Sequence, residues 1–389
     1  MNFIPAALIE RSWYDALSHL EYGTLSFTTP NGEVRIFPGP QPGPHAVFRI
    51  RDWSVIRHVA SRGDIALGED YIDGAWDTDS IENLIALFLL NLDHIDRFAH
   101  GNSVQRLGFL LRDRLVRRNS VSGAARNIKS HYDVGNEFYR LWLDDSMTYS
   151  SALFDPPNLN LAGAQHRKYD RILDKFTGDR ASVLEIGCGW GGFAQAASGR
   201  AHDVTGITIS PAQHSYAVER LKGAADIRLE DYRATRGLFD MIVSIEMFEA
   251  VGEHYWGKFF DVVSQRLKRG GRAVVQTITI RDELFAAYRS RSDFIRHYVF
   301  PGGMLPSLKR FREEAEAAGL RIADVFSFGQ DYVRTLREWS ARLGTCESEV
   351  QALGYDHAFL RNWQFYLGMC AAAFAVERTN VVQVELRHA

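Results

Sequence analysis

The stretch Glu185-Ile186-Gly187-Cys188-Gly189-Trp190-Gly191-Gly192-Phe193 (EIGCGWGGF, residues 185–193) decides the fold of this chain. It follows the β-branched run SVLEI and opens an amphipathic helical pattern. Glycines at these positions let the backbone turn tightly and approach a ligand closely. The stretch therefore predicts a strand, a ligand-binding glycine loop and a helix, which is the first unit of a parallel α/β sheet.

Further strand patterns follow this loop at the spacing of an alternating α/β fold. From Ala181 onward, apolar runs alternate with amphipathic helical stretches, which indicates a parallel sheet wound by crossovers. The predicted strands are SVLEI (182–186), DVTGITI (203–209), DIRLEDY (226–232), FDMIVSI (239–245), RAVVQTITI (272–280), LRIADVFSF (320–328) and VVQVELRH (381–388). Seven strands ending in a late one predict a class I methyltransferase, Rossmann-like sheet. The insertion 281–307 is expected to form a lid over the carboxyl ends of the strands.

The glycine loop admits two cofactors, a dinucleotide and S-adenosylmethionine. A dinucleotide site needs an acidic residue about 20 residues further on, to hold the ribose hydroxyls. That position reads Ile207-Thr208-Ile209-Ser210 and has no acid, whereas Glu185 lies two residues before the first glycine. This arrangement favours S-adenosylmethionine. Asp231 and Tyr232, at the end of the third strand, could accept the adenine amino group and stack on the ring.

The part before the sheet reads as a separate domain. Residues 1–120 mix a strand pair around Pro30-Asn31-Gly32 with helical stretches, so we expect a smaller α+β accessory domain that associates with lipid. A basic segment runs from Arg106 to about residue 129 and links this domain to the catalytic domain, residues 130–389. The segment contains Arg106, Arg112, Arg114, Arg117, Arg118, Arg126 and Lys129, with Asp113 as its only acid.

Composition and charge narrow the functional classes. The net charge of −3 gives no overall attraction to nucleic acid, and the three separated cysteines suggest neither disulfides nor a zinc site. The N-terminus lacks the basic start and apolar core of a signal peptide, and no apolar run reaches the roughly 18 residues of a spanning helix. We therefore expect a cytoplasmic protein that meets the inner face of the membrane through its surface.

Five motifs in order resemble the cyclopropane-fatty-acyl-phospholipid synthase family. They are HYDVGNEFYRLWLDDSMTYSSALF (131–154), GCGWGG (187–192), TISPAQ (208–213), MFEAVG (247–252) and YVFPGGMLPS (298–307). The resemblance is dense from about residue 129 to 376. It implies an enzyme that transfers the methyl group of S-adenosylmethionine to the double bond of an unsaturated fatty acyl chain in phospholipid.

The resemblance also implies roles for individual residues in holding the cofactor. Tyr149 and Ser150 would close over it, Thr208 and Gln213 would replace the missing ribose acid, and Asp231 with Tyr232 would take the adenine. The methionine and ribose parts would be cradled by Glu185, Gly187, Cys188, Gly189, Trp190, Gly191 and Gly192.

The family further implies a bound bicarbonate that removes a proton after methyl transfer. Glu249, Tyr332 and the backbone of Ile278 match its ligands, whereas Ser151 and Gln276 stand where many members have cysteine and histidine. Glutamine donates a hydrogen bond to an anion but does not carry its proton. The helical, apolar surroundings of Cys370 suggest packing rather than the catalysis sometimes assigned to the matching cysteine. Tyr298 and Phe300 would line the substrate pocket.

The departures at Ser151 and Gln276 bear on the identity of the product. So does Ala250, which stands where many members of the family have a histidine after the glutamate. Attack of an alkene on the sulfonium methyl leaves a carbocation, which aromatic faces stabilise. Proton loss then gives a cyclopropane, or after a hydride shift a methylene or methyl-branched chain. The alternatives are a methyltransferase for a soluble oxygen or nitrogen acceptor and a non-catalytic lipid-binding protein. Two points of attachment to a membrane favour a homodimer.

Overall fold

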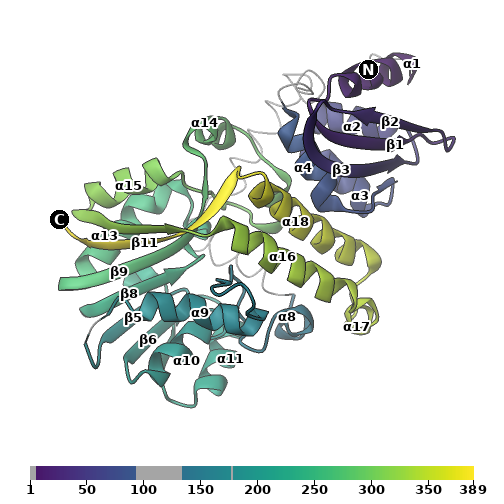
Figure 1. Cartoon of the computed structure of the whole chain (residues 1–389). Helices are drawn as coiled ribbons and strands as arrows, with labels where there is room; N and C mark the ends of the chain where they lie inside the picture. Colours follow the sequence, from purple (N-terminus) through teal and green to yellow (C-terminus); the bar gives the residue numbers. More distant parts are fainter. Residues whose placement is uncertain (1–5, 93–133, 177) are drawn as a thin grey trace. The chain divides into compact units, whose positions relative to one another are not determined.

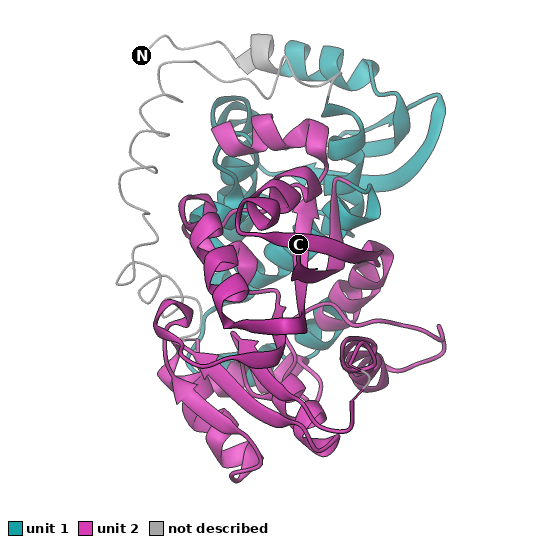
Figure 2. Cartoon of the chain, turned by 90° about the vertical axis from the view of Figure 1, so that its left-hand side faces the viewer, with its two compact units in different colours: residues 1–116, 291–299, 340–377 teal, residues 117–290, 300–339, 378–389 magenta. Residues whose placement is uncertain are grey.

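The computed structural model describes residues 6–92, 134–176 and 178–389, with side chains from residue 10 onward, as two compact units. Unit 1 comprises residues 1–116, 291–299 and 340–377, and unit 2 comprises residues 117–290, 300–339 and 378–389 (Figure 2). Two segments that the sequence analysis placed with the catalytic domain thus pack in unit 1. The predicted boundary at residues 120–129 and the basic segment 106–129 lie outside the described residues.

Unit 1 is built on a small mixed sheet with the strand order β2-β1-β3-β4 (Figure 1). Its strands are β1 (Tyr22–Thr28), β2 (Val34–Pro38), β3 (Gln41–Ile50) and β4 (Trp76–Asp77). The predicted strand pair is present, since β1 and β2 are antiparallel, and β3 adds a parallel partner to β1. The helices are α1 (Ala6–Ser18), α2 (Ser54–Arg62), α3 (Asp64–Ile72), α4 (Ile81–Leu90), α17 (Glu347–Ala352) and α18 (His357–Ala375).

Aromatic packing joins the distant segments of unit 1. Phe365 of α18 meets Trp76 of β4 with a ring separation of 6.2 Å and Phe294 with 4.8 Å. Gly68 of α3 lies directly under the ring of Phe294, where a β-carbon would approach to 2.3 Å. These buried contacts explain why residues 291–299 and α18 belong to unit 1 although they are remote in sequence.

Unit 2 contains a seven-stranded sheet in the order β10-β11-β9-β8-β5-β6-β7, in which β11 alone is antiparallel to its neighbours. The strands are β5 (Ser182–Ile186), β6 (Asp203–Thr208), β7 (Asp226–Leu229), β8 (Phe239–Ile245), β9 (Leu267–Ile280), β10 (Leu320–Ser327) and β11 (Thr379–His388). All seven predicted strands are present. The chain therefore has the α/β, Rossmann-like fold that the sequence predicts.

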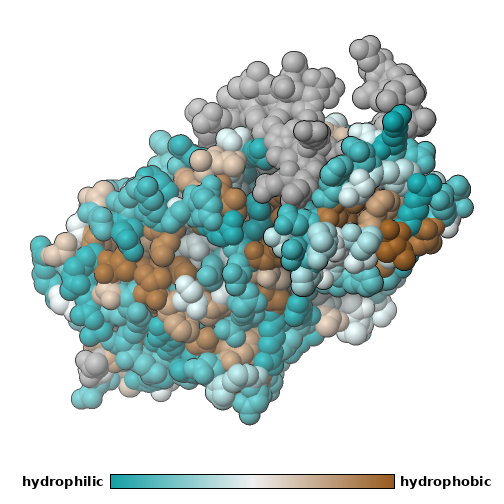
Figure 3. All heavy atoms as spheres, turned by 45° about the horizontal axis from the view of Figure 1, so that its top comes forward, coloured by the Kyte–Doolittle hydropathy of each residue, from teal (hydrophilic) through white to brown (hydrophobic). Residues whose placement is uncertain are grey.

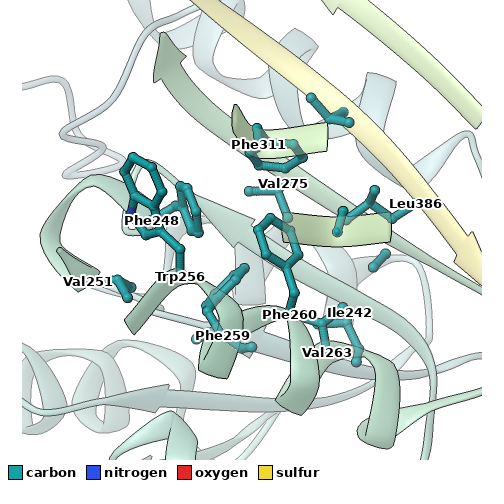
Figure 4. Packing of buried hydrophobic residues seen from close by; sticks show 14 of the residues in the cluster. Ile242, Phe248, Val251, Trp256, Phe259, Phe260, Val263, Val275, Phe311 and Leu386 are labelled. Atoms are coloured by element: carbon teal, nitrogen blue, oxygen red, sulfur yellow. The ribbon is translucent and has the colours of Figure 1, made fainter. Parts of the chain in front are cut away.

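Helices cover both faces of this sheet (Figure 1). On one face pack α9 (Leu161–Leu173), α10 (Gly192–Gly199) and α11 (Pro211–Leu221), through Ile172, Phe193 and Ala217. On the other pack α12 (Phe248–Val251), α13 (Trp256–Arg266) and α15 (Leu308–Ala317), whose rings form the cluster in Figure 4. Both faces are buried, which is why the central strands read as continuous apolar runs.

The remaining elements connect or extend these layers. They are α8 (Asn136–Trp142), α14 (Asp282–Ser290), α16 (Gly329–Gly344), the 3-10 turns Tyr232–Ala234 and Glu253–Tyr255, and the π-helical turn Ile295–Val299. The predicted lid, 281–307, thus consists of α14 and the π-helical turn, and its residues 291–299 pack in unit 1. Within the described ranges, none of the helices combines the length and apolar character required to span a bilayer.

Candidate active site

The candidate site lies at the carboxyl ends of the parallel strands of unit 2. Glu185 lies near the end of β5, Thr208 ends β6, Asp231 follows β7 by two residues and Glu246 comes directly after β8. Strands β5 and β8 are neighbours in the centre of the sheet. Ligands of open α/β sheets bind at this edge, so the fold brings the predicted cofactor residues to the place where a ligand is expected.

The glycine loop has the backbone conformation for which only glycine is suited. Gly187, Gly189 and Gly191 have φ angles of +84°, +52° and +85°. The amides of Gly187 and Cys188 both donate to the carbonyl of Ile207, which ties the loop to β6. A β-carbon at Gly189 would meet nothing within 4 Å. The loop is thus fixed to β6 by two hydrogen bonds, and the space beside Gly189 is open. A ligand can therefore approach its backbone closely.

Glu185 supplies the polar group of this cradle. Its side chain is buried, and burial raises its pKa well above the ordinary value. Among the described residues, its Oε2 atom has no hydrogen-bond partner. A buried acceptor left without a donor is costly unless a ligand provides one. The residues present therefore fit S-adenosylmethionine, which offers hydroxyl and ammonium donors and a positive sulfonium.

Two further predicted pairs lie at the ends of β6 and β7. The Thr208 hydroxyl donates to Gln213 Oε1 at 3.0 Å, so the pair forms one buried polar unit. Asp231 accepts two hydrogen bonds from the Arg233 guanidinium, a partner that the sequence analysis did not foresee. Burial alone would raise the pKa of Asp231, but Arg233 outweighs burial and lowers it. The Tyr232 ring packs on Phe259, and its adenine role stays a prediction.

The segment before α9 brings aromatic side chains to the site. Tyr149 packs against Tyr139, Trp142 and Trp339, with ring separations of 5.6, 5.5 and 5.4 Å. Trp190 of the glycine loop meets Tyr139 at 4.9 Å and donates to Asn136. The aromatic wall therefore includes the predicted Tyr149 and Trp190, together with rings that the sequence analysis did not name.

The predicted anion ligands converge on Glu246. Tyr332 donates its hydroxyl to Glu246 Oε2 at 2.6 Å, and Gln276 donates its amide to Oε1 at 2.7 Å. The backbone amide of Ser151 donates to the same Oε1 at 2.8 Å, while the Ser151 hydroxyl donates to the Ala152 carbonyl. The structure thus brings together three residues that were predicted as ligands of one anion, and it does so around the carboxylate of Glu246, which the prediction omitted.

Glu249 takes a different position from the one expected. Its Oε1 accepts from the Thr277 hydroxyl at 2.9 Å and from the Ile278 amide, and its Oε2 has no partner among the described residues. Burial, with the nearby Glu246 carboxylate, raises the pKa of Glu249 to about 8. Glu249 and Ile278, both predicted ligands, therefore bind each other, and Glu249 is largely neutral at pH 7.

A buried lysine lies close to the carboxylates of the site. Lys168 of α9 is fully buried and donates to Ser150 Oγ and Gln165 Oε1, both at 2.6 Å. Burial lowers its pKa to about 7, and the carboxylates of Glu246, Asp144 and Glu185 oppose that fall. Lys168 thus provides the positive charge that offsets the site's carboxylates, and it gives Ser150 a structural partner.

Sequence reasoning missed Glu246, Lys168 and Trp339. A usable signal existed for Glu246, because it lies three residues before Glu249 and directly follows a predicted strand. Its backbone φ of +49° is unusual for any residue other than glycine and marks a constrained position. Lys168 and Trp339 lie in ordinary amphipathic helix patterns, so nothing in the local sequence distinguishes them.

Three predicted residues do not take part in the contacts above. Cys370 lies in α18 and Tyr298 in the π-helical turn, both in unit 1, where the Tyr298 hydroxyl donates to Glu69 at 2.6 Å. Phe300 follows in unit 2 and is half-buried. Their roles in catalysis and substrate binding stay predictions.

Replacing Glu185 with glutamine should weaken S-adenosylmethionine binding by roughly 10- to 100-fold, because a charge-assisted hydrogen bond is worth about 1.5–3 kcal/mol. Isothermal titration calorimetry measures the change. The exposed Glu219 of α11 provides the control, and Glu219→Gln should bind normally. Equal affinity in Glu185→Gln and wild type would remove Glu185 from the cofactor site.

Comparisons with known proteins point to one family. Residues 119–384 match the family model described as mycolic acid cyclopropane synthetase. The tuberculostearic acid methyltransferase UfaA1 of Mycobacterium tuberculosis is 33% identical over 88% of this chain and 83% of its own. The cyclopropane-fatty-acyl-phospholipid synthase of Escherichia coli is 34% identical over 87% of both chains.

A solved structure adds a view of the cofactor. The mycolic acid cyclopropane synthase CmaA1, complexed with SAH and CTAB, matches with a TM-score of 0.63 and 30% identity. The match covers 67% of this chain and 97% of that one. A relative with the same fold thus holds the demethylated cofactor.

Proposed function

The chain belongs to the mycolic acid cyclopropane synthetase family, and on that basis we propose that it methylates the carbon–carbon double bond of an unsaturated acyl chain in phospholipid. It is an S-adenosylmethionine-dependent methyltransferase. One observation carries the proposal: the glycine loop after β5 and the carboxylate cluster after the neighbouring β8 share one edge of the sheet. This arrangement supports a methyl donor and a proton acceptor acting in the same site.

S-adenosylmethionine, when bound, supplies an electrophilic methyl group on a sulfonium. An isolated alkene is a weak nucleophile, so the chain must align it and exclude water. Tyr149, which is partly exposed and whose ring is held by the buried Trp142 and Trp339, is suited to both tasks. Its π faces also stabilise the positive charge that develops on the acyl chain.

Loss of one proton completes the reaction and determines the product. Loss from the added methyl group closes a cyclopropane ring, and the same loss after a hydride shift gives a methylene branch. A saturated methyl branch requires a separate reduction. The proposal covers these outcomes, and the relatives' names include both a fatty acid methyltransferase and a cyclopropane synthase.

The assay for this function uses methyl-labelled S-adenosylmethionine and vesicles of unsaturated phospholipid. We expect label in the acyl chains, and NMR of the released fatty acids distinguishes a ring from a methylene branch, which are isomers of equal mass. Label that stays in the cofactor, or that enters only the head group, would refute the proposal.

We also propose that the enzyme is cytoplasmic, works as a homodimer and meets the membrane peripherally. In unit 1, β2 carries Val34 and Ile36 with 59% and 66% of their surface exposed. On the face of the protein that Figure 3 shows, patches of apolar residues lie between hydrophilic residues. A peripheral membrane protein commonly binds through exposed apolar side chains, which enter the lipid interface, and through basic residues, which are attracted to anionic lipid.

Reversing the charge of Arg114, Arg117 and Arg118 to glutamate should weaken binding to anionic vesicles by at least about 100-fold, since each basic residue near a charged surface contributes around 1 kcal/mol. Co-sedimentation with vesicles measures this. The control reverses three exposed cations of unit 2, Lys222, Arg269 and Lys309. If both triple variants sediment like the wild type, the basic segment does not bind the membrane.

A further inference from the structure

We propose that Glu246 is the catalytic base of this enzyme, so that a side-chain carboxylate removes the proton for which the family resemblance implies a bound bicarbonate. This inference rests on the proposed function, because it assigns the proton acceptor of that reaction. It is carried by the hydrogen bonds that Glu246 accepts and by its backbone conformation.

The hydrogen bonds around Glu246 are those of an anion site already filled. Three donors reach its carboxylate: the hydroxyl of Tyr332, the amide of Gln276 and the backbone amide of Ser151, at 2.6, 2.7 and 2.8 Å. A carboxylate and bicarbonate present the same planar pair of oxygens and the same charge. Because these three donors are engaged, and because two anions repel at close range, the position that they surround is closed to a second anion.

The orientation of Gln276 is itself fixed by the sheet. Gln383 is its direct partner in the register between β9 and β11, and Gln383 donates to Gln276 Oε1 at 3.0 Å. This bond leaves the Gln276 amide hydrogens for Glu246. Glutamine at this position is therefore matched to a permanent carboxylate, because it donates without competing for the proton.

The two neighbouring glutamates have different roles because their environments differ. Glu249 has one oxygen with two donors and one with no donor in the described part of the chain, whereas both oxygens of Glu246 accept hydrogen bonds. Burial raises the pKa of Glu246 as well, but the Lys168 ammonium and its three donors oppose that rise. These hydrogen bonds and the nearby ammonium favour the charged form at Glu246 more than at Glu249.

The backbone at Glu246 is constrained in a way that serves a site rather than the fold. Its φ of +49° lies in the left-handed region, and its amide donates to the Gln276 carbonyl at 2.8 Å. A residue with a β-carbon in this conformation costs about 1 kcal/mol or more, which glycine would avoid. The chain retains glutamate at a position where glycine would fold more easily, which points to a chemical role for the carboxylate.

The proposed reaction consists of methyl transfer followed by loss of a proton to Glu246. Methyl transfer breaks the sulfur–carbon bond, and the π electrons of the alkene form the new carbon–carbon bond and leave a cation on the acyl chain. Glu246 Oε2, which accepts one hydrogen bond, has a second lone pair that takes a proton from the added methyl group. The electron pair of that carbon–hydrogen bond closes the ring or forms the methylene double bond. The protonated Glu246 then returns its proton to solvent.

Glu246→Gly and Glu246→Gln test this assignment. Glycine fits the backbone and empties the carboxylate position, whereas glutamine fills it without basicity. We expect both variants to bind S-adenosylmethionine normally and to lose turnover by about 100-fold or more. Sodium bicarbonate or sodium formate should restore at least about tenfold of the lost turnover to Glu246→Gly and none to Glu246→Gln. The wild-type enzyme should work equally well in buffer stripped of bicarbonate.

Each other result has a definite meaning. Near-wild-type turnover in either variant, a Glu246→Gly variant that neither anion rescues, or a wild type that requires added bicarbonate would overturn the assignment. Failure of the proposed function is distinguishable, because the wild type would then leave no label in the acyl chains under any condition. Calorimetric binding of S-adenosylmethionine by both variants confirms that they are folded.

Discussion

Glu249→Gln should make the chain markedly more stable at pH 8 and only slightly more stable, if at all, at pH 5. The pKa of Glu249 is raised from 4.5 in the unfolded chain to about 8 in the folded protein. The folded state therefore binds a proton that the unfolded state releases over this interval, and wild-type stability falls as the pH rises from 4.5 to 8. Glutamine is neutral throughout and removes that loss.

The expected gain at pH 8 is on the order of 3–5 kcal/mol, because each unit of pKa corresponds to about 1.4 kcal/mol. Thermal melts of variant and wild type at a series of pH values measure it as a growing difference in Tm. The exposed Glu316 is a matched control, and Glu316→Gln should show no such trend. A difference that is constant with pH would contradict a raised pKa at Glu249.

The same experiment probes the coupling of the two glutamates. The Glu246 carboxylate is the second cause of the raised pKa of Glu249, after burial. In a Glu246→Gln background the pKa of Glu249 should fall, and the pH range in which Glu249→Gln adds stability should move to lower pH. This shift separates the charge of Glu246 from the burial that both residues share.

The larger elements of unit 2 were predictable from sequence for a physical reason. A strand buried on both faces reads as a continuous apolar run, and in the glycine loop the backbone is left-handed at three closely spaced glycines, which the sequence shows directly. Strand β3 was missed because its first half contains Pro42, Gly43 and Pro44, which argue against a strand. It forms because its second half, 46–50, buries alternate side chains in unit 1.

The contacts of the site were less predictable than its members. Tyr332, Gln276, Ser151 and Ile278 were all named from sequence as ligands of a bicarbonate. In the structure the first three donate to Glu246, which the prediction omitted, whereas Ile278 donates to Glu249. Residues three apart after a strand lie on the same turn, and local sequence does not tell which of two carboxylates points at a given donor. Strand register decides it, since Gln276 of β9 pairs with Ile245, the residue directly before Glu246.

Phe248→Ala should destabilise the chain by about 3–5 kcal/mol, the usual cost of removing a buried ring. Phe248 is fully buried, and its ring meets Trp256, Phe259, Phe260 and Phe311 with centroid separations of 5.0–5.5 Å (Figure 4). No other side chain can move into so rigid a cluster without breaking further contacts. Urea unfolding followed by circular dichroism measures the loss.

This substitution should also reduce turnover, because Phe248 begins α12 between the two glutamates of the site. The ring anchors the turn that sets the direction of Glu246 and Glu249, so its loss leaves both carboxylates less well positioned, and a small misplacement costs catalysis heavily. Phe248→Leu fills most of the space and should cost about 1–2 kcal/mol while retaining most turnover. If alanine costs no more than leucine in stability, or leaves turnover intact in the folded fraction, then the hydrophobic cluster does not position the carboxylates and the turn must be held by its backbone bonds alone.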